Sequence, residues 1–253
     1  MPQNDASIPR RLEGRIALIT GGARGQGAAH ARRLAQEGAC VIAVDILDED
    51  GAALAQALRD EKLSVTYRHL DVTSKPEWAA LHDYIAHTHG KLDILVNNAG
   101  IVRINDIAHE TLENWTQVLN VNLTGAFLGL QSMIPLLRSS GNASVINTSS
   151  IFGPSGAPGY VAYATSKAGL LGFSRTAALE LAPDGIRVNA LVPGGVSTPL
   201  NEAEKEGGVI PETPLRRRAF PQELAAAVAF LASDDASFMT GAELVVDGGF
   251  STR

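Results

Sequence analysis

Cysteine is almost absent from the sequence, which contains only Cys40 among its 253 residues. A single cysteine excludes a disulfide framework within the chain, and its place in the apolar run 39–44 is typical of a buried structural thiol. No stretch approaches the roughly 18 consecutive apolar residues that a membrane span needs. Residues 1–11 are polar and lack the apolar core of a secretory signal. We therefore expect a cytoplasmic protein without a membrane partner.

Basic residues are outnumbered: 21 lysines and arginines stand against 27 aspartates and glutamates, a net charge of -6. Because nucleic acid binding requires a basic face, this class of partner is not expected. The one dense basic run, Arg216-Arg217-Arg218, is more typical of a solvated turn than of a polyanion site. The share of hydrophobic residues, 45%, is that of an ordinary globular protein. No metal site is predicted.

Short β-branched runs alternate with longer helical stretches from about residue 15 to the end of the sequence. Helical patterning covers residues 28–37, which end at Gly38, and residues 160–181, which end before Pro183. Repeated strand–helix units indicate parallel strands joined by right-handed crossovers. They predict an α/β fold, a single doubly wound Rossmann-type domain with a seven-stranded parallel sheet flanked by helices. The strand candidates are residues 15–20, 39–45, 65–70, 92–97, 144–148, 187–192 and 243–246.

No composition break or long linker divides the chain. We therefore expect a flexible segment over residues 1–11, followed by one domain over residues 12–253. Residues 199–219 are the one irregular insertion, with three prolines, two adjacent glycines and many charges. This composition indicates a lid over the substrate site rather than a domain boundary.

The first predicted strand leads directly into the glycine-rich turn Gly21-Gly22-Ala23-Arg24-Gly25-Gln26-Gly27, which a helix follows. Glycines let the backbone turn tightly and approach a pyrophosphate, and the helix N-terminus offers N–H donors and the positive end of its dipole. His30 replaces the last glycine of the G-x-G-x-x-G spacing. The strand before the turn, the helix after it and an acid at the end of the second strand together predict a dinucleotide site.

That acid is Asp45, eighteen residues after Gly27. Its carboxylate can accept both hydrogen bonds of the adenosine ribose diol, and it repels the 2′-phosphate of NADP. The alternative for such an aspartate is a capping or surface role, which Asp48 serves equally well. Arg24 in the glycine turn favours NADP instead, because a basic residue there can bind a 2′-phosphate. A repulsive carboxylate outweighs a flexible arginine, so NAD is the predicted cofactor.

Tyr163 and Lys167 stand four residues apart on the predicted helix 160–181 and therefore share one face. A tyrosine has an ordinary pKa of about 10, and a neighbouring ammonium ion lowers such a pKa by roughly 1–3. A phenol tuned in this way exchanges a proton with a substrate hydroxyl or carbonyl. The pair alone is a weak signal, because tyrosine and lysine often meet at this spacing by chance on an exposed helix.

Besides the glycine turn and the Tyr163/Lys167 pair, further motifs occur along nearly the whole chain. The sequence resembles the classical short-chain dehydrogenase/reductase family over roughly residues 12–250, with the motifs in the family's order and at its intervals. One departure is the turn 216–219, which holds three arginines where relatives commonly carry a glycine. The motifs are Thr20-Gly21…Gly25-x-Gly27, Asp71-Val72, Asn97-Asn98-Ala99-Gly100, Asn120-Val121-Asn122-Leu123, Ser149-Ser150, Tyr163…Lys167, Pro193-Gly194…Thr198 and Val246-Asp247-Gly248-Gly249.

The resemblance implies a role for each catalytic side chain. Tyr163 transfers the proton, and Lys167 binds the nicotinamide ribose and lowers the pKa of the phenol. Ser150 bonds the reacting oxygen; Ser149 competes for this role, but the thirteen-residue interval to Tyr163 favours Ser150. Asn122 holds a water that links the lysine to solvent.

The resemblance also implies contacts along the whole dinucleotide. Asn98 contacts a ribose and braces the sheet, although a purely structural turn is the alternative. Asp71 and Val72 receive the adenine, and Val196 and Thr198 hold the nicotinamide carboxamide. The predicted cofactor-binding residues are Gly21, Arg24, Gly25, Gln26, Gly27, Asp45, Asp71, Val72, Asn98, Tyr163, Lys167, Val196 and Thr198, and the predicted catalytic residues are Asn122, Ser150, Tyr163 and Lys167.

These residues predict an NAD(H)-dependent oxidoreductase that interconverts a secondary alcohol and its ketone by hydride transfer. The segments expected around the substrate, 101–104, 151–155, 158–160 and 194–215, are mostly apolar and favour an alicyclic, aromatic or steroid-like substrate. One alternative is an NADPH-dependent 3-oxoacyl-carrier-protein reductase, which the arginine run favours and the acidic net charge opposes. Another is a non-catalytic NAD-binding sensor or scaffold, which the presence of all four catalytic side chains opposes.

A homotetramer is expected from the resemblance and from two apolar surfaces. One is formed by Phe173, Ala177, Ala178 and Leu181 on the predicted catalytic helix, and the other by the run 244–246. The alternative is that both surfaces belong to the core of the single chain.

Overall fold

The computed structural model describes residues 8–199 and 209–252. Its centre is a sheet of seven strands in the order β3-β2-β1-β4-β5-β6-β7, and every neighbouring pair is parallel. The chain builds outward from β1 to β3, returns to the centre at β4 and builds outward again to β7. The strands are β1 (Ile16–Thr20), β2 (Cys40–Asp45), β3 (Val65–His69), β4 (Ile94–Asn97), β5 (Ala143–Thr148), β6 (Ile186–Pro193) and β7 (Glu243–Val246).

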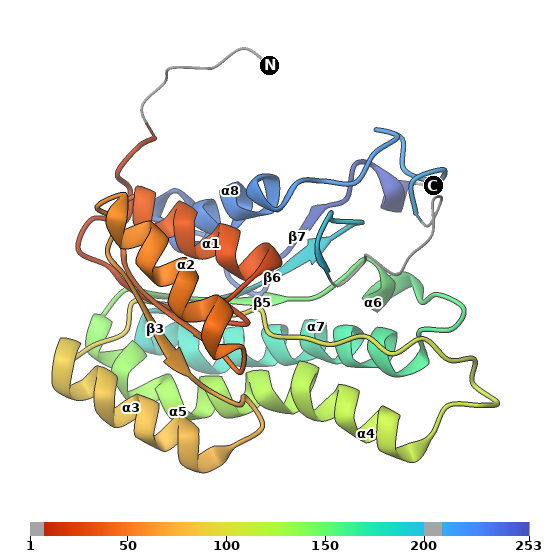
Figure 1. Cartoon of the computed structure of the whole chain (residues 1–253), viewed down its shortest axis with the longest axis horizontal. Helices are drawn as coiled ribbons and strands as arrows, with labels where there is room; N and C mark the ends of the chain where they lie inside the picture. The colour runs from red at the N-terminus through yellow and green to blue at the C-terminus, as the bar shows by residue number, and fades with distance from the viewer. Residues whose placement is uncertain (1–7, 200–208, 253) are drawn as a thin grey trace.

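Helices cover both faces of this sheet (Figure 1). One face carries α1 (Gly25–Gln36), α2 (Asp48–Asp60) and α8 (Pro221–Ala232), and the other carries α3 (Lys75–His89), α4 (Leu112–Leu119), α5 (Gly125–Ser140) and α7 (Val161–Leu181). The short helix α6 (Phe152–Ser155) precedes α7. Each face has an apolar core of its own, around Leu34 and Val228 on the first side and around Trp78 and Met133 on the second. Burial on both sides explains why the strands are nearly continuous apolar runs.

All seven predicted strands are confirmed, and with them the predicted fold class. Their ends differ from the prediction by at most two residues, the largest difference being at β4, which begins at Ile94. Just before it, the buried carboxylate of Asp93 accepts a hydrogen bond from Ile16 N at 2.8 Å, while its backbone N donates to Ile16 O at 2.9 Å. Helix α1 begins at Gly25, three residues before the predicted start, because the end of the glycine turn is already helical.

A π-helix, η1 (Asn120–Thr124), joins α4 to α5 and has no counterpart in the sequence analysis. It contains the predicted catalytic Asn122, whose side chain is buried. Single π turns inside helices are frequent at functional sites, because the extra residue re-aims a side chain. The π geometry therefore turns the amide of Asn122 inward.

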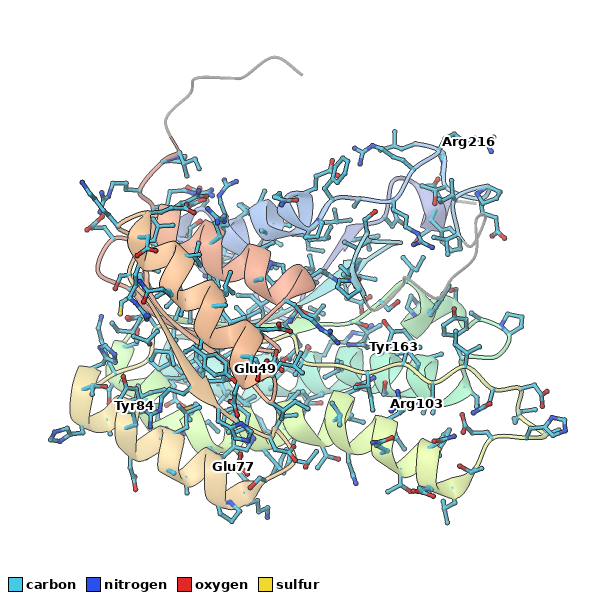
Figure 2. All side chains as sticks on the ribbon, in the orientation of Figure 1. Glu49, Glu77, Tyr84, Arg103, Tyr163 and Arg216 are labelled. Carbon is cyan, nitrogen blue, oxygen red and sulfur yellow. The ribbon has the colours of Figure 1, made fainter. Side chains whose placement is uncertain are left out.

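The flexible segment predicted over residues 1–11 and the lid predicted over 199–219 fall partly outside the described residues, and both stay predictions. Within the described part, Arg11 binds the buried carboxylate of Glu37 through two nitrogens, each at 2.8 Å, and Asp235 through a third. Arg216, labelled in Figure 2, has a φ of 56°. This left-handed conformation favours glycine, which accounts for the glycine-containing turn that the resemblance implied here.

No helix in the described residues is long and apolar enough to cross a membrane. No three histidine, cysteine, aspartate or glutamate side chains gather there as a metal ion would need.

The prediction that an apolar surface on α7 forms an interface between subunits is wrong for most of its residues. Ala177, Ala178 and Leu181 are buried in the core between α7 and the sheet, and Phe173 packs against that core. The second surface is also mostly internal, since on β7 only Val245 is exposed. A helix face that packs on its own sheet and one that packs on another subunit have the same apolar pattern, so the sequence cannot separate them.

Candidate active site

Two adjacent cavities lie at the carboxyl ends of the strands. The larger has a volume of about 940 Å³ and runs along the ends of β1, β2 and β4, and the smaller, of about 70 Å³, lies between β5, β6 and α7. Gln26, Asn98, Gly100 and Thr198 line both. Ligands of doubly wound folds bind in this place, where the strand order reverses.

The predicted site residues gather around these cavities with two exceptions. Gly27 and Asn122 line neither and are buried beside them. The larger cavity is lined by Gly21, Arg24, Gly25, Gln26, Asp45, Asp71, Val72, Asn98 and Thr198, and the smaller by Gln26, Asn98, Ser150, Tyr163, Lys167, Val196 and Thr198.

The glycine turn has the backbone that a phosphate cradle requires. Gly21 and Gly25 have φ of 63° and 58°, in the left-handed region that favours glycine. Gly27 meets a packing constraint instead, because a Cβ there would lie 2.0 Å from the Gly21 carbonyl oxygen. The N-cap of α1, Arg24, makes no side-chain cap bond, and the first turn holds no acidic residue. The helix N-terminus therefore fits the pyrophosphate of a dinucleotide.

Thr20, at the end of β1, fixes the turn after β4, and the sequence analysis missed this role. Its Oγ1 accepts hydrogen bonds from Asn98 N and Ala99 N, both at 3.0 Å, and donates to Val96 O. The Asn98 amide donates in return to Thr20 O and Gly21 O. Asn98 thus braces the glycine turn against β4.

Asp45 ends β2 with its carboxylate at the wall of the larger cavity. Oδ2 accepts a hydrogen bond from Ala23 N at 3.1 Å, and Oδ1 accepts from Ile46 N at 2.8 Å and Leu47 N at 3.3 Å. These backbone donors hold the carboxylate in a fixed orientation. Arg24 lines the same cavity, so both charges that the sequence analysis weighed against each other are near the expected adenosine ribose.

The segment after β3 forms the end of the larger cavity where adenine is expected. The Asp71 carboxylate accepts hydrogen bonds from Thr73 N at 2.9 Å and Thr73 Oγ1 at 2.8 Å, while its backbone N–H donates to Glu77 Oε2. Val72 is buried against Gly125, where a Cβ would lie 2.8 Å from it. Asp71 and Val72 therefore form a rigid wall against which a planar base can lie.

Tyr163 and Lys167 share one face of α7, as their spacing predicts, and both line the smaller cavity. Figure 2 labels Tyr163 on this helix. Lys167 Nζ lies 5.6 Å from the centroid of the tyrosine ring and donates a hydrogen bond to Thr148 O at 2.7 Å. Burial lowers the pKa of Lys167 to about 8, because the charged form loses hydration. The amine is thus mostly protonated at pH 7.

The two serines after β5 are used differently, although both line the smaller cavity. Ser149 Oγ donates its proton to Lys167 O at 2.7 Å and so anchors α7 to the sheet. Ser150 Oγ accepts a hydrogen bond from Phe152 N at 3.2 Å, which leaves its own proton for a further acceptor. This difference favours Ser150 as a donor to a reacting oxygen.

Asn122 holds the loop after β4 in place. Its Oδ1 accepts from Ile101 N at 2.8 Å, and its Nδ2 donates to Ile101 O at 2.9 Å and to Ser166 Oγ at 3.0 Å. Ser166 Oγ donates in turn to Tyr163 O at 2.7 Å. Asn122 thereby links the loop to the helix that carries the tyrosine, and Ser166 is a member of this network that the sequence analysis missed.

An aromatic row lies next to Tyr163. The ring of Tyr160 stands 6.2 Å from the ring of Tyr163 and 4.9 Å from that of Phe152, measured between centroids. Of this row only Tyr163 lines the smaller cavity, which Val196 also lines. Val196 pairs with Ala219 through an isolated bridge.

Comparison with known proteins agrees with this arrangement. Residues 21–251 match a family described as enoyl-(acyl carrier protein) reductase. The chain is 46% identical to the 3-alpha-(or 20-beta)-hydroxysteroid dehydrogenase of Mycobacterium tuberculosis over 239 residues, 94% of this chain and 90% of that protein. It is 41% identical to the trans-4-hydroxycyclohexanecarboxylate dehydrogenase of Sinomonas cyclohexanicum over 248 residues, 96% of this chain and 95% of that protein.

A solved structure is similarly close. The gluconate 5-dehydrogenase from Burkholderia cenocepacia, in complex with NADP and tartrate, superposes with a TM-score of 0.92 at 34% identity, over 98% of this chain and 99% of that one. Fold, motifs and relatives agree over nearly the whole length. The chain therefore belongs to the short-chain dehydrogenase/reductase family and is an alcohol dehydrogenase that acts on CH–OH donors with NAD or NADP.

Proposed function

We propose that this enzyme interconverts a secondary alcohol and its ketone with NAD, with Tyr163 as the general acid/base. The observation that carries the proposal is the small cavity that Ser150, Tyr163 and Lys167 line, next to the larger cavity, or groove, that Asp45 lines. Because the two cavities share lining residues, a dinucleotide in the groove brings its nicotinamide end close to Tyr163.

Each side chain of the site has its own role in the proposed reaction. Bound NAD supplies the acceptor for the hydride that leaves the alcohol carbon. Tyr163 takes the proton from the alcohol oxygen and returns it in the reverse reaction. Lys167 places an ammonium charge beside the phenol, which favours the phenolate. Ser150 donates to the same oxygen and holds it, while Asn122 keeps the loop and helix around them in place.

NAD rather than NADP is proposed because the carboxylate of Asp45 is fixed at the groove wall by Ala23 N, Ile46 N and Leu47 N. A 2′-phosphate bound there meets a like charge, and two unit charges about 4 Å apart repel by roughly 1 kcal/mol in water and more where solvent is excluded. A preference for NAD of about tenfold to a thousandfold follows, since each 1.4 kcal/mol is a decade. Arg24 softens this preference without reversing it.

For the substrate we propose a secondary alcohol on an alicyclic, aromatic or steroid-like skeleton. Phe152 and Tyr160 form an aromatic row that ends at Tyr163. An alcohol whose oxygen reaches Tyr163 lies close to this row, which favours an apolar ring skeleton. By their names, the hydroxysteroid and hydroxycyclohexanecarboxylate relatives act on alcohols of rings.

Pairing within the chain weakens the support that the arginine run gives to the carrier-protein alternative. Arg217 binds the carboxylate of Glu223 through two nitrogens, at 2.6 Å and 2.7 Å, which compensates its charge. Arg216 donates to the neutral Pro211 O and keeps its charge.

A cytoplasmic homotetramer remains part of the proposal. Outside the core, the exposed apolar side chains include Phe127 on α5, Leu179 on α7 and Val245 on β7, which are candidates for contacts between subunits. Light scattering at micromolar concentration tests the assembly, and a mass near 26.6 kDa, that of one chain, refutes the tetramer.

The experiment that tests the activity is a screen of secondary alcohols with purified enzyme. Cyclic, steroidal and open-chain alcohols are each supplied with NAD⁺ or NADP⁺, and the absorbance of the reduced cofactor is followed. We expect reduction of NAD⁺ with at least one ring alcohol. Binding of NADH without turnover of any alcohol or ketone supports the scaffold alternative instead.

A further inference from the structure

The side chain of Tyr67, in the edge strand β3, reaches the turn that follows Asp45. Its hydroxyl lies 2.7 Å from Asp45 O and 2.8 Å from Asp48 Oδ1, so one proton is shared between two acceptors. Asp45 O also accepts from Leu70 N at 3.0 Å. The backbone of the residue that carries the cofactor-facing carboxylate is therefore held from β3.

The ring of Tyr67 packs closely against α2 at Gly51. Gly51 on α2 leaves a notch for it, because a Cβ at Gly51 would lie 2.1–2.6 Å from three ring atoms of Tyr67. The ring thus fills the space between β3 and α2, with its hydroxyl at the turn between β2 and α2. Any side chain at residue 51 would push the hydroxyl away from Asp45.

The same contact turns a second carboxylate away from the groove. Tyr67 and His69 lie on one face of β3, since alternate residues of a strand share a face. Both bind Asp48, with His69 Nδ1 at 3.0 Å from its Oδ1. Ile46 and Leu47 line the groove, whereas Asp48 does not. Asp45 is left as the carboxylate of this turn that faces the cofactor.

From this geometry we infer that Tyr67 is a positioning residue for cofactor selection: it holds the turn after β2 so that Asp45 faces the ribose and Asp48 does not. The inference rests on the proposed choice of NAD through Asp45. Tyr67 lies outside both cavities, so it acts through Asp45 and not on the cofactor itself.

Tyr67→Phe tests this inference, because phenylalanine still fills the Gly51 notch and loses only the hydroxyl. A lost hydrogen bond of ordinary strength changes an equilibrium by about threefold to tenfold. We expect kcat/KM with NAD to fall by that factor through KM, kcat to stay unchanged, and kcat/KM with NADP to stay level or rise. Tyr84→Phe is the matched control: this tyrosine on α3 packs under Arg68, and in the described residues its hydroxyl has no hydrogen-bond partner.

The double variant separates positioning from general stability. If Tyr67 acts through Asp45, Tyr67→Phe has no further effect on the NAD/NADP ratio once Asp45→Ala is present. Equal losses with both cofactors, additive effects in the double variant, or an unchanged ratio in Tyr67→Phe overturn the inference. If Asp45→Ala shifts the ratio and Tyr67→Phe does not, only this inference fails. A wild-type enzyme without preference for NAD overturns the proposed choice of cofactor and this inference together.

Discussion

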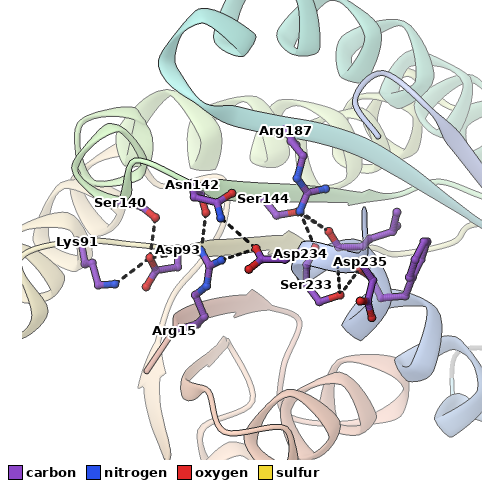
Figure 3. A network of polar contacts seen from close by, with 12 residues as sticks. Arg15, Lys91, Asp93, Ser140, Asn142, Ser144, Arg187, Ser233, Asp234 and Asp235 are labelled. Carbon is purple, nitrogen blue, oxygen red and sulfur yellow. Dashed lines mark hydrogen bonds and ion pairs between the residues drawn. The ribbon is translucent and has the colours of Figure 1, made fainter. Parts of the chain in front are cut away.

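The amino and carboxyl edges of the sheet, where the strands begin and end, use polar side chains in opposite ways. At the amino edge, where the strands begin, charged groups are paired with one another and with the backbone (Figure 3). Asp93 receives bonds from Ile16 N, Lys91 Nζ and Ser140 Oγ, and Arg15 bridges Asn142 O and Asp234. Arg187 donates to Leu231 O, in the last turn of α8, and to Ser233 O, the carbonyl of the residue that caps this helix.

At the carboxyl edge, donors and acceptors are aimed at open space. The N-terminus of α1 has no side-chain cap, Ser150 keeps a proton to donate, and Asp45 faces the groove. Groups that satisfy each other add to stability, and groups left open are available to a ligand. The comparison predicts that substitutions at the carboxyl edge change activity with little change in stability, and that substitutions at the amino edge do the reverse.

Tyr163→Phe is the largest expected effect and tests the carboxyl edge. The variant loses the hydroxyl proposed to exchange the proton, a transfer that is worth about 10²–10⁴ in rate. We expect kcat to fall at least about a hundredfold, with NADH affinity and melting temperature close to wild type. Steady-state kinetics, NADH fluorescence titration and thermal unfolding measure the three quantities. Activity like that of wild type would exclude Tyr163 as the acid/base.

Asp93→Ala tests the amino edge. Its carboxylate is 1% exposed, so the substitution leaves Ile16 N and Lys91 Nζ without their acceptor inside the protein. Breaking a buried pair in this way costs about 3 kcal/mol, which for a chain of this size lowers the melting temperature by about 6–12 °C. The kcat/KM of the folded enzyme should stay within about twofold of wild type. Asp83→Ala, an exposed carboxylate on α3, is the control and should not change the melting temperature.

His30 lies between the two edges, on the buried face of α1, and gives a test through the pH dependence of stability. Neither ring nitrogen has a partner in the described residues, and burial lowers the pKa of His30 to about 3. An unfolded chain, with a histidine pKa of about 6.5, takes up a proton that the folded chain refuses. Stability is therefore fully present above pH 6.5 and falls as the pH drops, by about 2 kcal/mol between pH 7 and pH 5.

The variant His30→Leu should remove this part of the pH dependence. Urea unfolding at pH 7 and pH 5 gives the slope for each protein. His87→Gln, an exposed histidine on α3, should keep the slope of wild type. If His30→Leu keeps the same slope as wild type, the histidine is not held neutral in the folded protein.

The sequence predicted the parts of the molecule that follow from local pattern. Strands buried on both faces are apolar runs, the glycine turn has its own composition, and a spacing of four residues places Tyr163 and Lys167 on one face. The parts that were missed depend on partners far along the chain. Thr20 bonds the turn at Asn98, 78 residues away, and no periodicity marks either residue as a partner of the other.

Other features were missed by the sequence analysis because two different local structures can have the same amino-acid composition. The π-helix around Asn122 contains ordinary helical residues, so only the structure separates it from an α-helix. The face of Ala177 and Leu181 was assigned to a subunit interface because core and interface are equally apolar. His30 was read as an interruption of a glycine motif, whereas its burial is the property that sets its pKa.

Asp45→Ala is the smallest of these effects, and it tests whether an open carboxylate at the carboxyl edge selects the cofactor. The variant removes both the acceptor for the ribose diol and the repulsion of a 2′-phosphate. Arg24 then lines the groove without the opposing charge. We expect the ratio of kcat/KM for NAD to that for NADP to fall by at least about tenfold, or 1.4 kcal/mol. Glu49→Gln is the charge control, since this residue of α2, labelled in Figure 2, does not line the groove and should leave the ratio unchanged. Equal ratios in wild type and Asp45→Ala would show that the arginine, not the carboxylate, governs this end of the site.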